Sequence, residues 1–220
     1  MTPIIVDKEL KRQHIMGSAL NVFLRKGYRE TKIKDIAEEA GIGKGTLYEY
    51  FDSKEDLGVQ LYEWINIIEE SQRKSELSMI DDPLERLRAY VLDIIDAHIR
   101  FSTFHDFVFG LWADVNRKKV EKGESDELDE ALHASMSSLR SVLRYGVEKG
   151  LIRVEDIETT AILLFSAIDG ICIHKGIGLK DLAPEELSWR TMDLLMSGIA
   201  TDEGKRRWED ESADHLDQQT

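Results

Sequence analysis

Apolar residues recur every three or four positions through most of this chain, a spacing typical of helices that bury one face. Alternating apolar and polar runs, which would indicate strands, are not evident, and there are only three prolines. The pattern therefore predicts an all-α protein. The expected helices cover residues 8–26, 32–40, 44–51, 53–78, 83–100, 103–120, 126–149, 156–175 and 184–200.

Capping residues sharpen several boundaries near the N-terminus. Thr31 and Ser53 stand where helix N-caps are expected, because a hydroxyl can accept a bond from an unpaired amide of the first turn. Gly41 stands where a helix needs a left-handed residue at its end. The three-residue turn 41–43 between two short helices predicts a helix-turn-helix, in which Leu47 and Phe51 face inward.

The later helices are more apolar than the earlier ones. The segment 161–173 is interrupted only by Ser166, Asp169 and Gly170, and a helix that is apolar nearly all round must be buried on several sides. Residues 202–220 are charged and lack periodic apolar positions, which predicts a disordered acidic tail. The predicted domains are 1–52, 53–201 and the tail 202–220.

The formal net charge of −14 is unevenly distributed. Residues 1–60 contain ten Lys/Arg and ten Asp/Glu, so the whole excess of acidic residues belongs to the remainder of the 220-residue chain. Local charge governs contact with phosphates, so the first domain remains compatible with nucleic acid. The single cysteine, the lack of a secretory apolar segment and the lack of a membrane-spanning run predict a cytoplasmic protein without a membrane partner.

Four motifs follow one another between residues 27 and 57: G-Y-x-x-T, D-I-A-x-x-A-G, G-T-L-Y-x-Y-F and S-K-E-x-L. This string resembles the DNA-binding domain of the TetR family of bacterial transcriptional regulators. The resemblance is strong over about residues 10–60 and extends further only by length and helical layout. It implies an N-terminal three-helix DNA-binding domain with a helix-turn-helix, followed by a C-terminal helical ligand-binding and dimerisation domain.

The resemblance also implies which residues contact DNA. Positions matching Thr46, Tyr48, Tyr50 and Lys54 bind phosphates in the family, and those matching Lys34, Lys44 and Gly45 can reach base edges, where lysine favours guanine. Plain core packing remains an alternative for Tyr48. The expected DNA-binding set is Thr31, Lys34, Lys44, Gly45, Thr46, Tyr48, Tyr50 and Lys54.

A pocket for a small-molecule effector is implied between the middle helices. The candidates are Trp64, Tyr90, His98, Phe104, Phe107, Trp112, Arg140 and Asp169. For each aromatic residue, core packing is the competing interpretation. Arg140 and Asp169 are stronger candidates, because a charge among apolar residues needs a partner or a ligand. Asp169 could instead serve a dimer interface or a bend at Gly170.

The last two long helices carry more apolar surface than one domain needs, and in the family such helices form a four-helix dimer interface. The interface candidates are Ala161, Leu164, Phe165, Ile168, Ile171, Cys172, Met192, Leu195, Met196 and Ile199. Filling the core of a monomer is the alternative. A dimer would suit DNA, because two recognition helices must reach half-sites about 34–36 Å apart.

The function predicted is a homodimeric, sequence-specific repressor that binds a palindromic double-stranded operator and is released by an effector. An activator, or a helical sensor acting through a protein partner, are the alternatives. An enzyme is not expected: 41–46 lacks the spacing of a phosphate-binding loop, no pair of histidines has metal-ligand spacing, and Cys172 has no base nearby in the sequence. We expect no cofactor and no metal.

Overall fold

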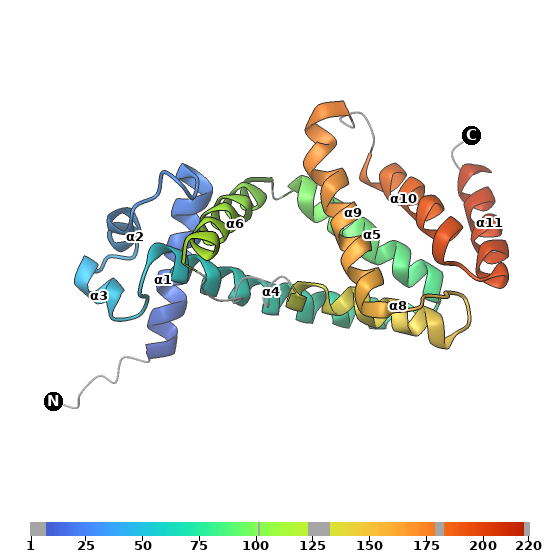
Figure 1. Ribbon diagram of the computed structural model, residues 1–220, viewed down its shortest axis with the longest axis horizontal. Helices are drawn as coiled ribbons and strands as arrows, with labels where there is room; N and C mark the ends of the chain where they lie inside the picture. Colours follow the sequence, from blue (N-terminus) through green and yellow to red (C-terminus); the bar gives the residue numbers. More distant parts are fainter. Residues whose placement is uncertain (1–7, 101, 123–132, 179–182, 218–220) are drawn as a thin grey trace. The chain divides into compact units, whose positions relative to one another are not determined.

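A computed structural model describes residues 8–100, 102–122, 133–178 and 183–217, which fold as helices in two compact units (Figure 1). Unit 1 comprises the chain to Ile67 together with Phe101–Leu132, and unit 2 comprises Ile68–Arg100 and His133–Thr220. The all-α prediction is confirmed. Unit 1 extends beyond the predicted boundary at residue 52, because it also contains the first part of a long helix, up to Ile67, and a later helix within Phe101–Leu132.

The helices lie close to their predicted positions. They are α1 (Lys8–Lys26), α2 (Ile33–Glu39), α3 (Lys44–Tyr48), α4 (Lys54–Ser78), α5 (Pro83–Arg100), α6 (Ser102–Lys122), α8 (Ser137–Glu148), α9 (Ile157–Gly178), α10 (Pro184–Ile199) and α11 (Asp202–Asp217). Within the described ranges, no helix is both long enough and apolar enough to span a bilayer.

Aromatic rings form the centre of unit 1, where α1 packs against α2 and α6. Phe23 of α1 stacks on Phe107 of α6 with ring centroids 4.9 Å apart, and Tyr28 lies against both rings. All three are buried, and each such side chain contributes about 1.5–3 kcal/mol through removal from water. Gly110 of α6 lies so close that an added Cβ would stand 3.1 Å from the Tyr28 Cβ. The Tyr28 ring therefore fixes α6 against the helix-turn-helix.

The turn that separates α2 from α3 closes by local hydrogen bonds. Gly41 has φ +62°, its amide donates to the Glu38 carbonyl at 3.1 Å, and the Ile42 amide donates to the Ala37 carbonyl at 3.0 Å. These two bonds define a Schellman motif, in which glycine avoids the strain that a side chain meets at positive φ. The predicted C-terminal role of Gly41 is confirmed.

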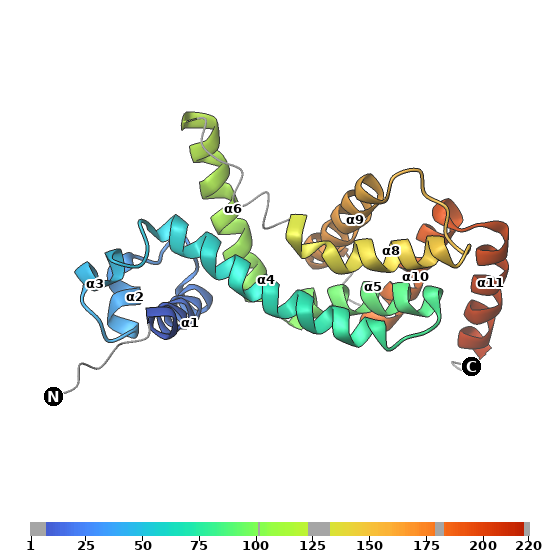
Figure 2. The ribbon, with the colours of Figure 1, turned by 90° about the horizontal axis from the view of Figure 1, so that it is seen from below.

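Helix α5 is central in unit 2, where it packs against α8, α9 and α10 (Figure 2). Leu84, Leu87, Val91 and Ile95 place an apolar stripe along it at helical spacing, and all four are buried. The Asp82 carboxylate accepts bonds from the amides of Leu84 and Glu85 and so caps the start of α5.

Several local predictions are wrong. Thr31 is not a helix cap: its buried hydroxyl donates to the Gly27 carbonyl at 2.7 Å, and Asp35 accepts the Lys32 amide at the start of α2 instead. Helix α3 ends at Tyr48, before the predicted residue 51. The helix expected over 126–149 is interrupted by a turn at Met136, after which α8 begins. The first residues of the expected helix lie outside those described.

The tail predicted to be disordered is helix α11. Thr201 begins it, because its hydroxyl accepts the Gly204 amide at 3.1 Å. Gly204 lies against the Leu151 carbonyl, and Trp208 is buried, where it donates to Asp193 at 2.7 Å and packs on Trp189. These contacts are made with residues distant in sequence, so they could not be predicted from the charged composition of α11.

Candidate nucleic-acid interface

Helix α3 is held from behind by its inward side chains. Leu47 and Phe51 are buried in the core of unit 1, as predicted. On the outward side, Lys44 and Gly45 are exposed, and Tyr48 has 45% of its surface exposed. The side chains available for contact on α3 are therefore hydrogen-bond donors and an aromatic ring rather than acids.

Lys44 and Tyr48 lie together on that outward side. The Lys44 ammonium stands 5.6 Å from the centre of the Tyr48 ring, a cation–π distance. Among the described residues Lys44 has no carboxylate partner, so its charge is available to a ligand. The exposed Tyr48 ring is thus not core packing, the alternative considered for it from the sequence.

Three other basic residues close to α2 form ion pairs with acidic residues of α2. Arg25 pairs with Glu39 at 2.8 Å, and Lys26 pairs with Asp35 at 2.8 Å. The Lys26 ammonium, followed by the Lys32 amide, lowers the pKa of Asp35, so this carboxylate stays ionised. Lys34 is exposed on α2 and lies 3.4 Å from Glu38. These three ion pairs reduce the positive charge that α2 presents to an anionic ligand.

Two residues of the predicted DNA-binding set face inward. The side chain of Thr31 is buried, and its hydroxyl donates to the Gly27 carbonyl within the turn. Lys54 donates to the Tyr28 carbonyl at 3.0 Å and lies 4.3 Å from the centre of the Tyr28 ring. Its charge is therefore engaged in tying the start of α4 to Tyr28. Thr46 and Tyr50 are half-buried.

The start of α4 is capped as predicted. Ser53 accepts the Asp56 amide at 3.0 Å, and the Asp56 carboxylate accepts the Asp52 amide at 2.8 Å. The segment that follows α3 is thereby fixed in position relative to the helix-turn-helix.

The predicted pocket residues divide between the two units. Trp64, Phe104, Phe107 and Trp112 belong to unit 1, while Tyr90, His98, Arg140 and Asp169 belong to unit 2. Phe107 is buried in the core of unit 1, and Trp112 is 47% exposed. Trp64 and Phe104 pack partly buried against the same core. The side chain of His98 lies outside the described residues.

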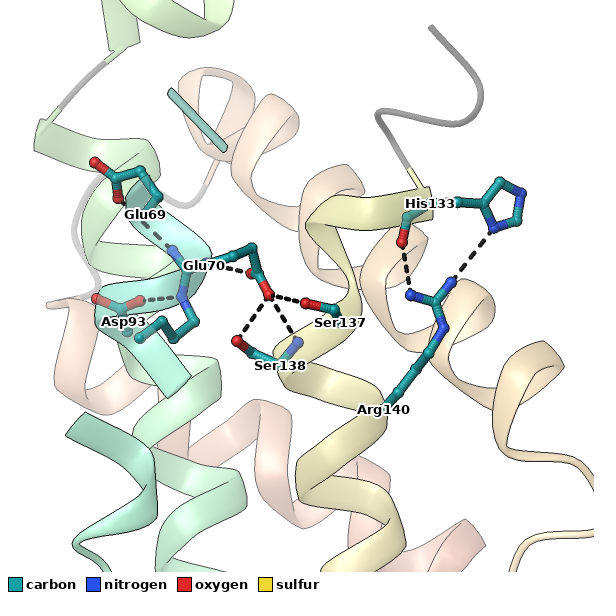
Figure 3. A network of polar contacts seen from close by, with 8 residues as sticks. Glu69, Glu70, Asp93, His133, Ser137, Ser138 and Arg140 are labelled. Carbon is teal, nitrogen blue, oxygen red and sulfur yellow. Dashed lines mark hydrogen bonds and ion pairs between the residues drawn. The ribbon is translucent and has the colours of Figure 1, made fainter. Parts of the chain in front are cut away.

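Arg140, in unit 2, has an acidic partner. Its guanidinium donates to both Glu158 oxygens at 2.5 Å. It also donates to the His133 carbonyl at 2.6 Å (Figure 3). This pairing raises the pKa of Arg140 and lowers that of Glu158. Arg140 is thus compensated without a ligand.

A buried polar network in unit 2 was not found from the sequence (Figure 3). Glu70 of α4 accepts four hydrogen bonds: one from Arg73 at 2.6 Å, and three at 2.7 Å from the Ser137 hydroxyl and from the hydroxyl and amide of Ser138. The carboxylate therefore caps α8 from another helix. Arg73 also donates to Asp93 at 2.6 Å. The one signal for this network in the sequence was Glu70, an acidic residue on a helix with apolar neighbours.

Most predicted dimer residues are already buried within unit 2. Ala161, Leu164, Ile168, Met192 and Met196 belong to its core, and Phe165, Leu195 and Ile199 pack partly buried against it. The side chains of Ile171 and Cys172 lie outside the described residues. Among the described side chains of the same two helices, the large apolar residues that are exposed are Ile162, Leu163 and Leu194. The helices chosen from the sequence thus do expose apolar surface, but through other residues.

Comparison with known proteins adds three kinds of finding. Residues 15–61 match the family model described as bacterial regulatory proteins, tetR family. The chain is 24% identical over 197 residues to the fatty acid metabolism regulator protein of Bacillus subtilis (strain 168), covering 88% of this chain and 97% of that protein. It is 31% identical over 119 residues to the biofilm operon icaADBC negative transcriptional regulator IcaR of Staphylococcus aureus, covering 48% of this chain and 63% of IcaR.

The fold is also similar to a solved regulator. The crystal structure of FadR from Bacillus subtilis in complex with stearoyl-CoA superposes with a TM-score of 0.66 at 21% identity, covering 85% of this chain and 98% of that one. At this identity the similarity concerns the fold.

Proposed function

We propose that this chain, which belongs to the tetR family of bacterial transcriptional regulators, is a homodimeric repressor that binds a palindromic operator and leaves it when a small-molecule effector binds unit 2. Its relatives are DNA-binding regulators and not enzymes, in agreement with the prediction from the sequence. The observation that carries the proposal is the outward side of α3, where Lys44, Gly45 and Tyr48 are exposed while Leu47 anchors the helix.

DNA docking follows from what α3 can offer to a groove. Lys44 can donate to guanine N7 and O6, and Gly45 permits close approach of the backbone. Lys34 on α2 can reach the same groove, although Glu38 competes for its charge. Because Arg25, Lys26 and Lys34 are paired with acids, we expect modest non-specific affinity and a small dependence on salt.

Dimerisation is proposed to use the exposed apolar residues of α9 and α10. Leu163 and Leu194 are 64% and 70% exposed, and Ile162 extends the apolar surface on α9. Burying such residues against a second copy would join two chains, each of which carries one α3. We expect Leu163→Glu to weaken self-association, measured by sedimentation equilibrium. Ile67→Glu is the matched control, since Ile67 on α4 is 69% exposed but lies on neither helix.

Selection of bound duplexes from a random pool at about 0.1–0.15 M salt tests the proposal directly. A recovered palindrome with half-sites about 34–36 Å apart, or a multiple of that, is expected. Sequencing the pool retained by Lys44→Ala then shows whether this side chain selects bases. Absence of enrichment, also at lower salt, would contradict the repressor and favour a sensor that acts through a protein partner.

A further inference from the structure

Arg12 of α1 occupies a position at which the helix would otherwise bury an apolar side chain. Ile15, Met16 and Ala19 follow it at helical spacing on the same face, and all three are buried. Arg12 itself is half-buried, and its guanidinium lies over the ring of the buried Phe51, 5.7 Å from the ring centre. This cation–π contact places the charged end of Arg12 beside the segment that follows α3.

The same guanidinium begins a chain of hydrogen bonds that ends on the backbone after α3. Arg12 donates to the side-chain oxygen of Gln60, and the side-chain nitrogen of Gln60 donates to Asp56 at 2.5 Å. The other Asp56 oxygen accepts the amide of Asp52 at 2.8 Å. Gln60 and Asp56 are four residues apart on α4, a spacing that places them on the same side of the helix. Arg12 is thus connected through two side chains of α4 to the segment between α3 and α4.

Glutamine suits the middle of this chain, because its side chain carries an acceptor and a donor at once. A carboxylate in place of Gln60 would accept from Arg12 but could not donate to Asp56, and a hydrocarbon side chain could do neither. Asp56 is itself anchored, because its amide donates to the Ser53 hydroxyl at 3.0 Å. The chain of bonds therefore ends on a fixed point at the start of α4.

Helix α3 is too short to keep its place without such support. It comprises five residues, Lys44–Tyr48, whereas isolated helices shorter than about 12–15 residues are marginal in water. The turn at Gly41 fixes the chain before α3. After α3, the ring of Phe51 lies against Arg12 and the amide of Asp52 is held by the hydrogen-bond chain. Arg12 thus contributes to both contacts that fix the chain on this side of α3.

We propose that Arg12 and Gln60 are positioning residues for operator recognition, which hold α3 in the orientation in which Lys44 reads the groove. The inference rests on the proposed function in taking α3 as the helix that contacts bases. A binding surface must be held within about 0.5 Å of its productive geometry. Non-specific binding depends on charge instead, so it tolerates a displaced α3.

The test removes the hydrogen bonds of Gln60 without removing a charge. Gln60→Met keeps the length and helix propensity of the side chain and loses the amide group that joins Arg12 to Asp56. Fluorescence anisotropy measures affinity for the selected operator and for a scrambled duplex over a range of salt. We expect operator affinity to fall about tenfold, comparable to the loss of one base contact. Affinity for the scrambled duplex should stay within about twofold, with the same salt slope.

Arg12→Met and the double variant test whether the two residues act as one chain. Arg12→Met should lose at least as much operator affinity as Gln60→Met. Adding the second substitution should cost no more than about a further twofold, because residues of one network are not additive. If Arg12 instead contacts a phosphate, its variant lowers the salt slope by about 1 and the two losses add. That result would overturn the inference.

Gln72→Met is the matched control. Gln72 lies on the same helix and also donates to an acid four residues away, Glu76 at 2.9 Å, but this pair is exposed. The control variant should bind both duplexes as the unaltered protein does. Thermal unfolding followed by circular dichroism establishes that each variant is folded at the temperature of the binding assay.

Amide hydrogen exchange gives a readout that needs no DNA. The amides of residues 49–53 should exchange faster in Gln60→Met than in the unaltered protein or in Gln72→Met. Faster exchange there in a protein that binds no duplex would uphold the positioning of α3 and contradict the repressor. Unchanged exchange, equal operator affinity of Gln60→Met and the unaltered protein, or equal losses on both duplexes would overturn the inference and leave the repressor standing.

Discussion

Among the described residues, each unit buries one tyrosine whose hydroxyl has no hydrogen-bond partner, yet the surroundings of the two tyrosines differ. In unit 1, Tyr28 lies among the rings of Phe23 and Phe107, and a single cation, Lys54, covers its face. In unit 2, Tyr90 lies among the charges of Arg73 and several carboxylates. Unit 1 has an aromatic interior and carries its hydrogen-bond donors outside, while unit 2 carries charged groups inside.

This difference bears on what mutations should do. A binding surface on the outside of a closed core can change without affecting folding, because exposed side chains contribute little to stability. A charged group in an interior is part of the fold, and its removal leaves a partner without compensation. We therefore expect binding and stability to separate in unit 1 and to be coupled in unit 2.

The largest effect is expected from Glu70→Ala. It removes four hydrogen bonds and leaves the half-buried Arg73 less well compensated. Breaking a buried pair in this way costs about 3–5 kcal/mol of unfolding free energy. Chemical denaturation followed by tryptophan fluorescence measures it. Glu69→Ala, whose side chain is 57% exposed, should stay within about 0.5 kcal/mol. Equal losses in both variants would show that the network is not a stabilising interior feature.

Gly204→Ala should come next, because an added methyl group would overlap the Leu151 carbonyl oxygen and displace α11. A backbone carbonyl cannot move aside easily, so we expect a loss of about 1–3 kcal/mol. Hydrogen exchange along α11 should rise at the same time. Gly198→Ala is the control: nothing lies near that Cβ, and helix propensity predicts a gain of up to about 1 kcal/mol.

Lys54→Ala tests whether the polar contact between Lys54 and Tyr28 stabilises unit 1. The variant loses the bond to the Tyr28 carbonyl and the contact with the ring, together about 1–2 kcal/mol for a partly exposed charge. Thermal unfolding should show the loss, and affinity for all duplexes should fall together as the start of α4 loosens. Unchanged stability with weaker DNA binding would instead make Lys54 a phosphate ligand, as the resemblance had implied.

Lys44→Ala should affect DNA binding alone. Lys44 is exposed and contacts the Tyr48 ring, a pairing of two surface side chains, so the unfolding free energy should change by less than about 0.5 kcal/mol. The slope of log affinity against log salt should fall by about 1 if the lysine contacts phosphate, while relaxed base preference would indicate a groove contact. A variant identical to the original in both assays would contradict docking through α3.

The smallest effect concerns pH. Burial, then the Asp82 charge, raises the pKa of Glu211 in α11, with Arg207 opposing. A carboxyl with a raised folded-state pKa favours the folded state fully below its unfolded pKa, and this advantage disappears as pH rises through the folded pKa. Glu211→Gln should therefore raise the melting temperature slightly at neutral pH and leave it unchanged in acid. A rise that persists in acid would have another cause.

The sequence predicted the positions of the unit 1 helices and the helix ends at Gly41 and Ser53, because these depend on residues within one or two turns; the cap predicted at Thr31 was wrong. Gly41 ends α2, Ser53 begins α4, and Leu47 and Phe51 anchor the outward-facing α3, all as expected. The exposure of Lys44 and Tyr48 follows from the same periodicity, since inward positions determine outward ones. The surface proposed to face DNA was therefore largely determined by local sequence.

Tertiary structure alone decided what depends on distant residues. Helix α9 is apolar on nearly all sides, so periodicity could not tell that Ile168 is buried and Leu163 exposed. Lys54 is turned inward by Tyr28, 26 residues away, and Glu70 finds Ser138 68 residues away. Helix α11 is ordered by Leu151 and Trp189 rather than by its own charged residues. Such contacts form only when the chain folds back on itself, and no local pattern encodes them.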